Sequence, residues 1–281
     1  MKGTVRSSGQ VVLITLLVLT IATTVALSLI ARTTTDTTIT SQVVESSRAF
    51  SAAEAGVEEA LKSASNSANE LTAGVSYTVT VSPINSSTGV FEFPTKVERG
   101  STGTVWLVNH DANNVPIEDP NDPGRYNAPS IDICWNTDAT TIPALAVTLL
   151  YKKSDGTYQV AHTAFDPSSD RAQTDNFSTV VASGGCGGNT GTDYRATLTF
   201  NDLGINRLTD TLMELRIRPV YNDATIAVDA GTNQLPLQGH RIESTGTTTT
   251  GMNRKIVVYQ QYRSPSTIFD AALYSQGSLT Q

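Results

Sequence analysis

The side chains that most often carry out chemistry are few in this sequence, and they stand far apart. The three histidines are His110, His162 and His240, and none lies in a motif typical of a nucleophile, a zinc site or a phosphate-binding loop. We therefore predict no catalytic site, no metal site and no cofactor, and we expect that the protein is not an enzyme. An exported enzyme held by its N-terminus is the remote alternative.

Four carboxylates, Asp111, Glu118, Asp119 and Asp122, gather in a proline-rich segment at residues 111–129. Their spacing differs from that of an EF-hand, so we interpret them as solvated turn residues, with a calcium site as the weaker alternative.

The two cysteines, Cys134 and Cys186, also lack the spacing of metal ligands. Outside the cytoplasm they would be expected to form one disulfide, which closes a loop of about 50 residues and stabilises the fold by roughly 3 to 4 kcal/mol in the chain-entropy model. Two free thiols are the alternative.

The charge of the chain is acidic overall but unevenly distributed. The formal net charge is -7, yet the only charged residues among the first 35 are Lys2, Arg6 and Arg32. The acidic remainder disfavours nucleic acid as a partner. The low share of charged residues in the whole chain, 16%, and its many Ser, Thr, Asn and Gly residues are typical of an exported β protein.

An uncharged run from Ser7 to Ala31 is long enough to cross a bilayer as a helix, and we assign the span to residues 10–31. Lys2 and Arg6 precede it, which predicts a single-pass membrane protein with a cytoplasmic N-terminus and its bulk outside or in the periplasm. No Gly or Pro interrupts residues 10–55, so one helix is expected from about Gln10 to about Ala64. Residues 32–66 are predicted to be amphipathic. The apolar residues of that part recur at helical spacing: Ile39, Val43, Phe50, Ala53, Val57 and Leu61.

The threonine-rich stretch at residues 33–40 is expected to be the weakest part of this helix, because β-branched residues lower helix propensity.

Beyond Asn66 the period of the apolar residues changes to two, as in Val75, Tyr77, Val79 and Val81. Short strands separated by Gly, Asn, Asp and Pro predict antiparallel sheets or a sandwich. They are expected at 75–81, 90–93, 104–108, 130–135, 144–152, 158–165, 194–200, 211–221, 239–244 and 254–262. The last two form a predicted hairpin, followed by a docking tail at residues 265–275.

The residues just before the apolar run are Arg6, Ser7, Ser8, Gly9 and Gln10. Here the chain resembles the type IV pilins, and the resemblance implies cleavage by a prepilin peptidase between Gly9 and Gln10. A secretory signal peptide cut near Ala26 or Ala31, or a simple N-terminal anchor, is the alternative. A signal peptide gives no reason for a helical pattern that continues for another 30 residues.

A second motif occupies residues 48–61. It contains Ala49, Phe50, Ala52, Ala53, Glu54, Ala55 and Gly56, and it resembles the N-terminal helix of PilX-type minor pilins and pseudopilins. The resemblance covers about residues 6–62. It implies a membrane-held subunit whose helix packs against other pilin subunits. The small residues of the motif allow another helix or a sheet to approach closely, and an ordinary helix docked on its own β domain would need the same residues.

Two residues depart from the family pattern. The fifth residue after the predicted cleavage is Ile14, where pilins of the main filament carry a glutamate, and Gln10 replaces the common aromatic residue or Met. Ile14 favours a position at a filament tip or in an initiation complex, with a charge supplied by another subunit as the alternative. Gln10 leaves the class of peptidase open.

We therefore predict an α+β fold: a long N-terminal helix, partly transmembrane, packed on an antiparallel sheet, with an inserted β-sandwich. The expected parts are a leader (1–9), the helix (10–66), a pilin-like β part (67–115), the inserted domain (116–218) and a C-terminal hairpin and tail (219–281). Cys134 beside Trp135 is similar to immunoglobulin-like sandwiches, although the spacing to Cys186 differs. The expected function is that of a minor pilin that presents an extracellular β domain, with adhesion as one role that this domain would serve. A membrane-anchored adhesin that does not polymerise is the alternative.

Overall fold

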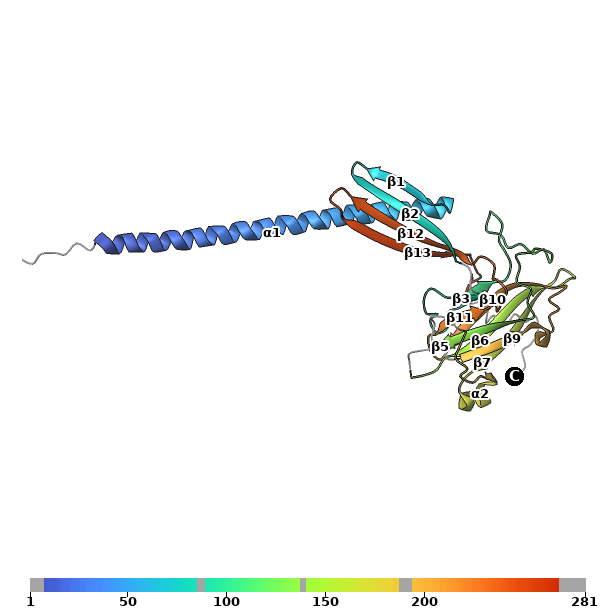
Figure 1. Ribbon diagram of the computed structural model, residues 1–281. Helices are drawn as coiled ribbons and strands as arrows, with labels where there is room; N and C mark the ends of the chain where they lie inside the picture. Colours follow the sequence, from blue (N-terminus) through green and yellow to red (C-terminus); the bar gives the residue numbers. More distant parts are fainter. Residues whose placement is uncertain (1–7, 85–88, 137–139, 187–193, 268–281) are drawn as a thin grey trace, which may run out of the picture. The chain divides into compact units, whose positions relative to one another are not determined.

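The computed structural model describes residues 8–84, 89–136, 140–186 and 194–267, and the chain divides into two compact units (Figure 1). Unit 1 consists of residues 1–81 and 242–258, and unit 2 of residues 82–241 and 259–281. The leader predicted at residues 1–9 lies outside the described residues up to position 7. The part of the predicted tail from residue 268 onward also lies outside them.

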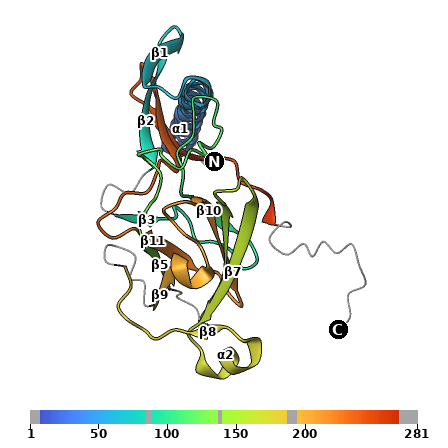
Figure 2. The ribbon, with the colours of Figure 1, turned by 90° about the vertical axis from the view of Figure 1, so that its right-hand side faces the viewer.

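Unit 1 combines one long helix with a four-stranded sheet, which confirms the predicted α+β class. The helix α1 (Ser8–Ser63) is continuous through the threonine-rich stretch, and Figure 2 shows it nearly end-on against the sheet. The strand order is β1-β2-β12-β13. Their bounds are β1 (Ser67–Thr72), β2 (Val75–Ile84), β12 (Gly239–Thr248) and β13 (Asn253–Gln261).

The alternation of side chains in β2 explains the core of unit 1. Val75, Tyr77 and Val79 are buried while the residues between them are exposed, as expected for a strand with one face on a core. Ile242 of β12 is fully buried in the same cluster. The predicted hairpin is present, since β12 and β13 are sheet neighbours joined at residues 249–252.

Unit 2 is a β-sandwich in which two sheets enclose one hydrophobic core. One sheet has the order β4-β10-β6-β7-β8 and the other β3-β11-β5-β9. The bounds are β3 (Val90–Glu92), β4 (Gly103–Trp106), β5 (Ser130–Asn136), β6 (Ala144–Lys152), β7 (Tyr158–Asp166), β8 (Ser178–Thr179), β9 (Tyr194–Thr199), β10 (Thr211–Val220) and β11 (Thr225–Asp229). The helix α2 (Ser169–Asp175) and the short 3-10 helix η1 (Phe200–Leu203) complete it.

The predicted boundaries of the inserted domain, residues 116 and 218, are wrong. Strands β3 and β4 precede residue 116, yet they pair with β11 and β10 rather than with the sheet of unit 1. The insertion therefore begins at Ser82 and continues to Arg241. Strand periodicity indicates where a strand is but not which strand lies beside it, so the pairing could not be foreseen.

Cys134 and Cys186 form a disulfide in unit 2, with their Cα atoms 5.7 Å apart. Cys134 lies on β5, and Cys186 lies in the connection between β8 and β9. The bridge thus ties a connecting segment to one sheet. In immunoglobulin domains the disulfide instead joins strands of the two facing sheets.

Candidate functional site: the N-terminal helix

The first two thirds of α1 present their side chains to the surroundings. Every residue from Gly9 to Val44 is exposed, including the large apolar residues of the run, such as Ile14 and Val18. This is the one helix in the described part of the chain that is long and apolar enough to cross a membrane. A helix that is apolar all round and not covered by its own fold is suited to lipid or to other helices.

The threonines of this helix are compatible with an apolar environment because their hydroxyls are satisfied within it. Thr15 donates to the Val11 carbonyl at 3.1 Å, Thr23 to that of Leu19 at 3.0 Å and Thr24 to that of Ile21 at 2.8 Å. The same bonds recur in the threonine-rich stretch, where Thr33 donates to the Leu29 carbonyl at 2.9 Å and Thr40 to that of Asp36 at 2.8 Å. No hydroxyl in these pairs needs water or a partner from outside the helix.

The last third of α1 lies on the sheet through a face of small residues. Ala49, Ala52, Ala53 and Ala60 are fully buried, and Gly56 is buried between them. A Cβ on Gly56 would lie 2.7 Å from Cγ2 of Val79 and 2.8 Å from Cδ2 of Tyr77. The small residues of the predicted motif therefore serve close contact between this helix and its own sheet.

Gly246 on β12 completes this close contact from the side of the sheet. A Cβ at this position would collide with the Ala49 carbonyl oxygen and come within 2.7 Å of the Ala53 nitrogen. Ile242 and Ser244 precede it at alternate positions of the same strand, and both are fully buried. The sequence predicts the hairpin but not this role of Gly246. The available signal was the position of Gly246, which continues the alternate, inward-facing positions of Ile242 and Ser244 on one strand. A glycine at such a position often marks a close backbone approach.

Two carboxylates of α1 fasten the helix to the sheet at either end of the contact. Glu59 accepts hydrogen bonds from the Tyr77 hydroxyl and from Asn69 Nδ2, the latter at 3.1 Å. Glu45 accepts one from Thr250 Oγ1 at 3.1 Å. The Tyr77 hydroxyl, followed by Asn69, lowers the pKa of Glu59 below its usual value of 4.5. The hydroxyls of Thr248 and Thr250 chiefly lower the pKa of Glu45.

These shifts predict a loss of stability in acid that depends on Glu59. A carboxylate whose pKa is depressed in the folded state stabilises it fully above the unfolded pKa, and the stabilisation is lost as the pH falls through the folded pKa. We expect Glu59→Gln to flatten the dependence of the unfolding temperature on pH between about pH 5 and about pH 3. Circular dichroism melts of the full chain measure this. Glu58→Gln, at an exposed neighbouring position, is the control, and identical pH profiles for wild type and Glu59→Gln would contradict the assignment.

Only two of the six apolar residues predicted at helical spacing pack on the core of unit 1, namely Ala53, which is fully buried, and Val57, which is partly buried. Ile39, Val43, Phe50 and Leu61 are all exposed, Phe50 to 48%. Glu54 of the motif is exposed as well. Large apolar residues stand out in a helical pattern, but here the alanines and Gly56 make the contact because only they allow the backbones to approach. A separate apolar stripe is therefore left open on the docked part of α1.

Gly9 and Gln10 lie in the first turn of α1, and both are exposed. A Cβ on Gly9 would meet no atom within 4 Å. Glycine in a helix costs about 1 kcal/mol relative to alanine. No contact of the described residues therefore calls for glycine at this position.

The histidines and the acidic segment do not come together as a site. His110 stacks on Tyr262 with ring centres 3.8 Å apart and meets Trp106 edge-on, and burial lowers its pKa to about 4. His162 lies on β7 and His240 on β12. Asp111 and Asp119 accept hydrogen bonds from backbone N–H groups of their own turns, at 2.8 Å in each case. Within the described residues, no group of three or more His, Cys, Asp or Glu side chains could hold a metal ion.

No family model, no curated protein and no solved structure matches this chain.

Proposed function

We propose that this protein is a minor type IV pilin or pseudopilin, a structural subunit that joins the tip or the initiation complex of a pilus-like assembly. One observation carries the proposal. A single helix of 56 residues, about 84 Å long at the standard rise, is a core element of a sheet at one end and wholly exposed and apolar at the other. A removable signal peptide gives no reason for this continuity, and a simple anchor gives no reason for the exposed stripe around Phe50.

The subunit would first be held in the membrane by residues 10–31, with the β units outside. After cleavage its apolar half would leave the lipid and pack among the helices of neighbouring subunits. Gly9 fits a cleavage site, because no contact of the described residues requires glycine there. Ile14, exposed at 52%, offers no carboxylate to pair with the amine of another subunit inside an apolar bundle, which favours a terminal position.

The position of the mature N-terminus tests this proposal. We expect the chain isolated from its native membrane to begin at Gln10, as measured by intact mass and N-terminal sequencing. Gly9→Leu should leave the precursor uncut, because a bulky side chain would not fit a peptidase that requires a small residue. Gly3→Leu, in the predicted leader, is the matched control and should be processed normally. A chain that keeps Met1 would contradict the proposal and favour a permanently anchored adhesin, and a start near Ala26 or Ala31 would indicate a signal peptide.

The exposed stripe yields a second test, on assembly. Phe50→Ala should change the free energy of unfolding by about 0.5 kcal/mol or less, because Phe50 is exposed, while the amount of the chain in sheared surface filaments falls. Phe91→Ala is the contrasting variant, since Phe91 is buried in unit 2 and its loss should cost about 3 to 5 kcal/mol. Unchanged incorporation of Phe50→Ala would argue against a helix-to-helix contact at this stripe.

A further inference from the structure

The outer face of the five-stranded sheet in unit 2 contains a hollow with a floor of two alanines. Ala146 of β6 lies between Ala164 of β7 and Arg218 of β10 in the strand register. The flanking residues Leu145 and Val147 are buried in the core, so Ala146 points outward. Because these two neighbouring side chains are short, they leave space above the outer face of the sheet. The resulting cavity has a volume of about 380 Å³.

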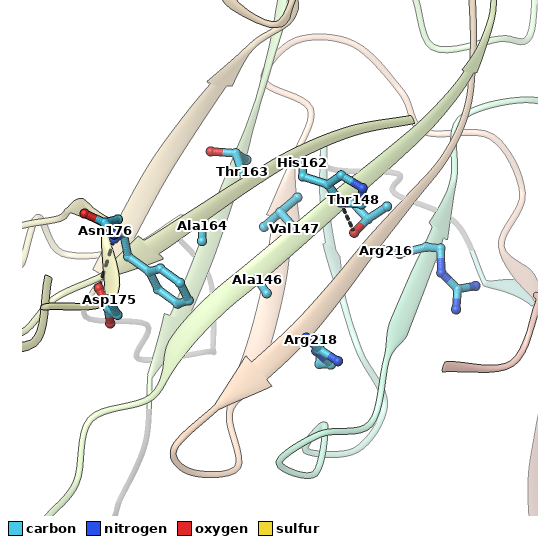
Figure 3. A pocket seen from close by; sticks show the side chains of 11 residues that line it. Ala146, Val147, Thr148, His162, Thr163, Ala164, Asp175, Asn176, Arg216 and Arg218 are labelled. Carbon is cyan, nitrogen blue, oxygen red and sulfur yellow. Dashed lines mark hydrogen bonds between the residues drawn. The ribbon is translucent and has the colours of Figure 1, made fainter. Parts of the chain in front are cut away.

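Polar groups from three separate segments surround this floor (Figure 3). Asp175 and Asn176 lie on one side, at the end of α2, and Arg218 lies on the opposite side. Thr148 and His162 form a third side, with Thr148 Oγ1 3.1 Å from His162 Nδ1.

The segment that carries Asp175 and Asn176 is held in place by its own hydrogen bonds. Asp175 accepts one from the Phe177 backbone N–H at 2.9 Å and one from the Tyr221 hydroxyl at 3.2 Å. Asn176 adopts the left-handed conformation that ends α2, with a φ of 60°. Phe177, which is half-buried, adds an apolar surface to the lining.

Arg218 is the distinctive group of the hollow. It is half-buried, and no hydrogen bond or ion pair to another described residue involves it. The other lining arginine, Arg216, lies 3.8 Å from Glu214 and is almost fully buried. A guanidinium carries five N–H donors in a planar fork that matches a carboxylate. The donors of Arg218 are therefore available to an anionic group that enters the hollow.

We propose that this hollow binds an acidic sugar unit, of the uronic-acid class, as part of a polysaccharide. Its carboxylate would accept hydrogen bonds from the guanidinium of Arg218. Its hydroxyls would exchange hydrogen bonds with Thr148, His162 and Asn176, and the apolar face of its ring would lie against Phe177. The cavity falls within the size range of small-ligand sites. Hydroxyl and amide side chains outnumber the arginines around it. Phosphate sites instead gather several cations or backbone N–H groups, so a phosphate is the poorer fit.

Titration of the full chain with D-glucuronate and with an oligogalacturonate tests the proposal. The chain is kept in a detergent without a sugar headgroup, and binding is followed by saturation-transfer NMR of the ligand and by calorimetry. We expect saturable binding of both acids, with D-glucose at least tenfold weaker because it lacks the carboxylate. Arg218→Gln should weaken binding at least tenfold, and Arg218→Lys by less. Ala164→Leu should abolish binding by filling the hollow without entering the core. Lys153→Gln, which removes an exposed cation outside the lining, is the matched control and should bind as the wild type does.

Several outcomes would overturn the assignment. They are the absence of saturable binding, equal affinity for glucose and glucuronate, or binding that neither Arg218→Gln nor Ala164→Leu changes. Saturation by inorganic phosphate or by an acidic peptide alone would also overturn it. The experiment does not depend on cleavage or polymerisation, so its failure would leave the proposed pilin function standing.

Discussion

Replacing Gly246 by valine is expected to detach α1 from its sheet. A side chain there would collide with the backbone of α1 at Ala49 and Ala53, and backbone atoms cannot move aside as the end of a flexible side chain can. Overpacking of this kind costs about 1 to 3 kcal/mol and occasionally more. We expect the upper part of that range, about 3 kcal/mol, because the obstruction comes from two backbone groups of the same helix.

Amide hydrogen exchange in β2 and β12 measures this loss, and the tryptophans supply an internal comparison. Both tryptophans of the chain, Trp106 and Trp135, belong to unit 2, so their fluorescence should report an unchanged unfolding transition there. Thr245→Val, at the preceding residue on the other face of β12, keeps the shape of the side chain and should have little effect. Unchanged protection of β12 in Gly246→Val would refute the close approach.

An aspartate at Val18 is expected to keep most of the chain out of the membrane. Val18 lies in the middle of the apolar run and is exposed at 58%. A charged residue at the centre of a spanning helix costs about 3 kcal/mol on the insertion scale, which corresponds to roughly a hundredfold change in partition. The variant should therefore move from the membrane fraction to the soluble or degraded fraction.

Val43→Asp supplies the control because Val43 is exposed on the same helix but lies beyond the predicted span. It should fractionate with the membrane as the wild type does. Equal fractionation of the Val18 and Val43 variants would show that residues 10–31 do not cross the bilayer.

The long helix was the most predictable element because its signal is local. The absence of Gly and Pro and a run of apolar residues indicated α1 within two residues of its observed ends. The strands with clear alternation, such as β2, were predictable for the same reason. By contrast, β1 (Ser67–Thr72) was missed because it is a polar, mostly exposed strand. The short strand β11 (Thr225–Asp229) was missed as well, and it is almost wholly buried, so it shows no alternation of apolar and polar residues.

The candidate site was predictable in its residues but not in its orientation. The motif around Ala52 and Gly56 was found, yet the sequence could not say that these residues are buried against the sheet while Phe50 remains exposed beside the contact. That depends on the complementary Gly246, nearly two hundred residues further along the chain. The hollow beside Arg218 could not be foreseen at all, because it depends on the register that brings Ala146 and Ala164 together.

Because β2 pairs with β12, the sheet of unit 1 forms only after most of the chain has been synthesised. Roughly 155 residues separate the end of β2 from the start of β12, and ribosomes add about 5 to 20 residues per second. On the order of 10 to 30 s therefore pass between the synthesis of β2 and that of β12, the strand that packs on the alanine face of α1. If α1 spans the bilayer as proposed, the bilayer alone would hold the nascent helix during that interval, and a chain truncated before Gly246 would have a helix that lacks β12 to pack on. The docking of α1 on its sheet therefore requires a strand that is synthesised late.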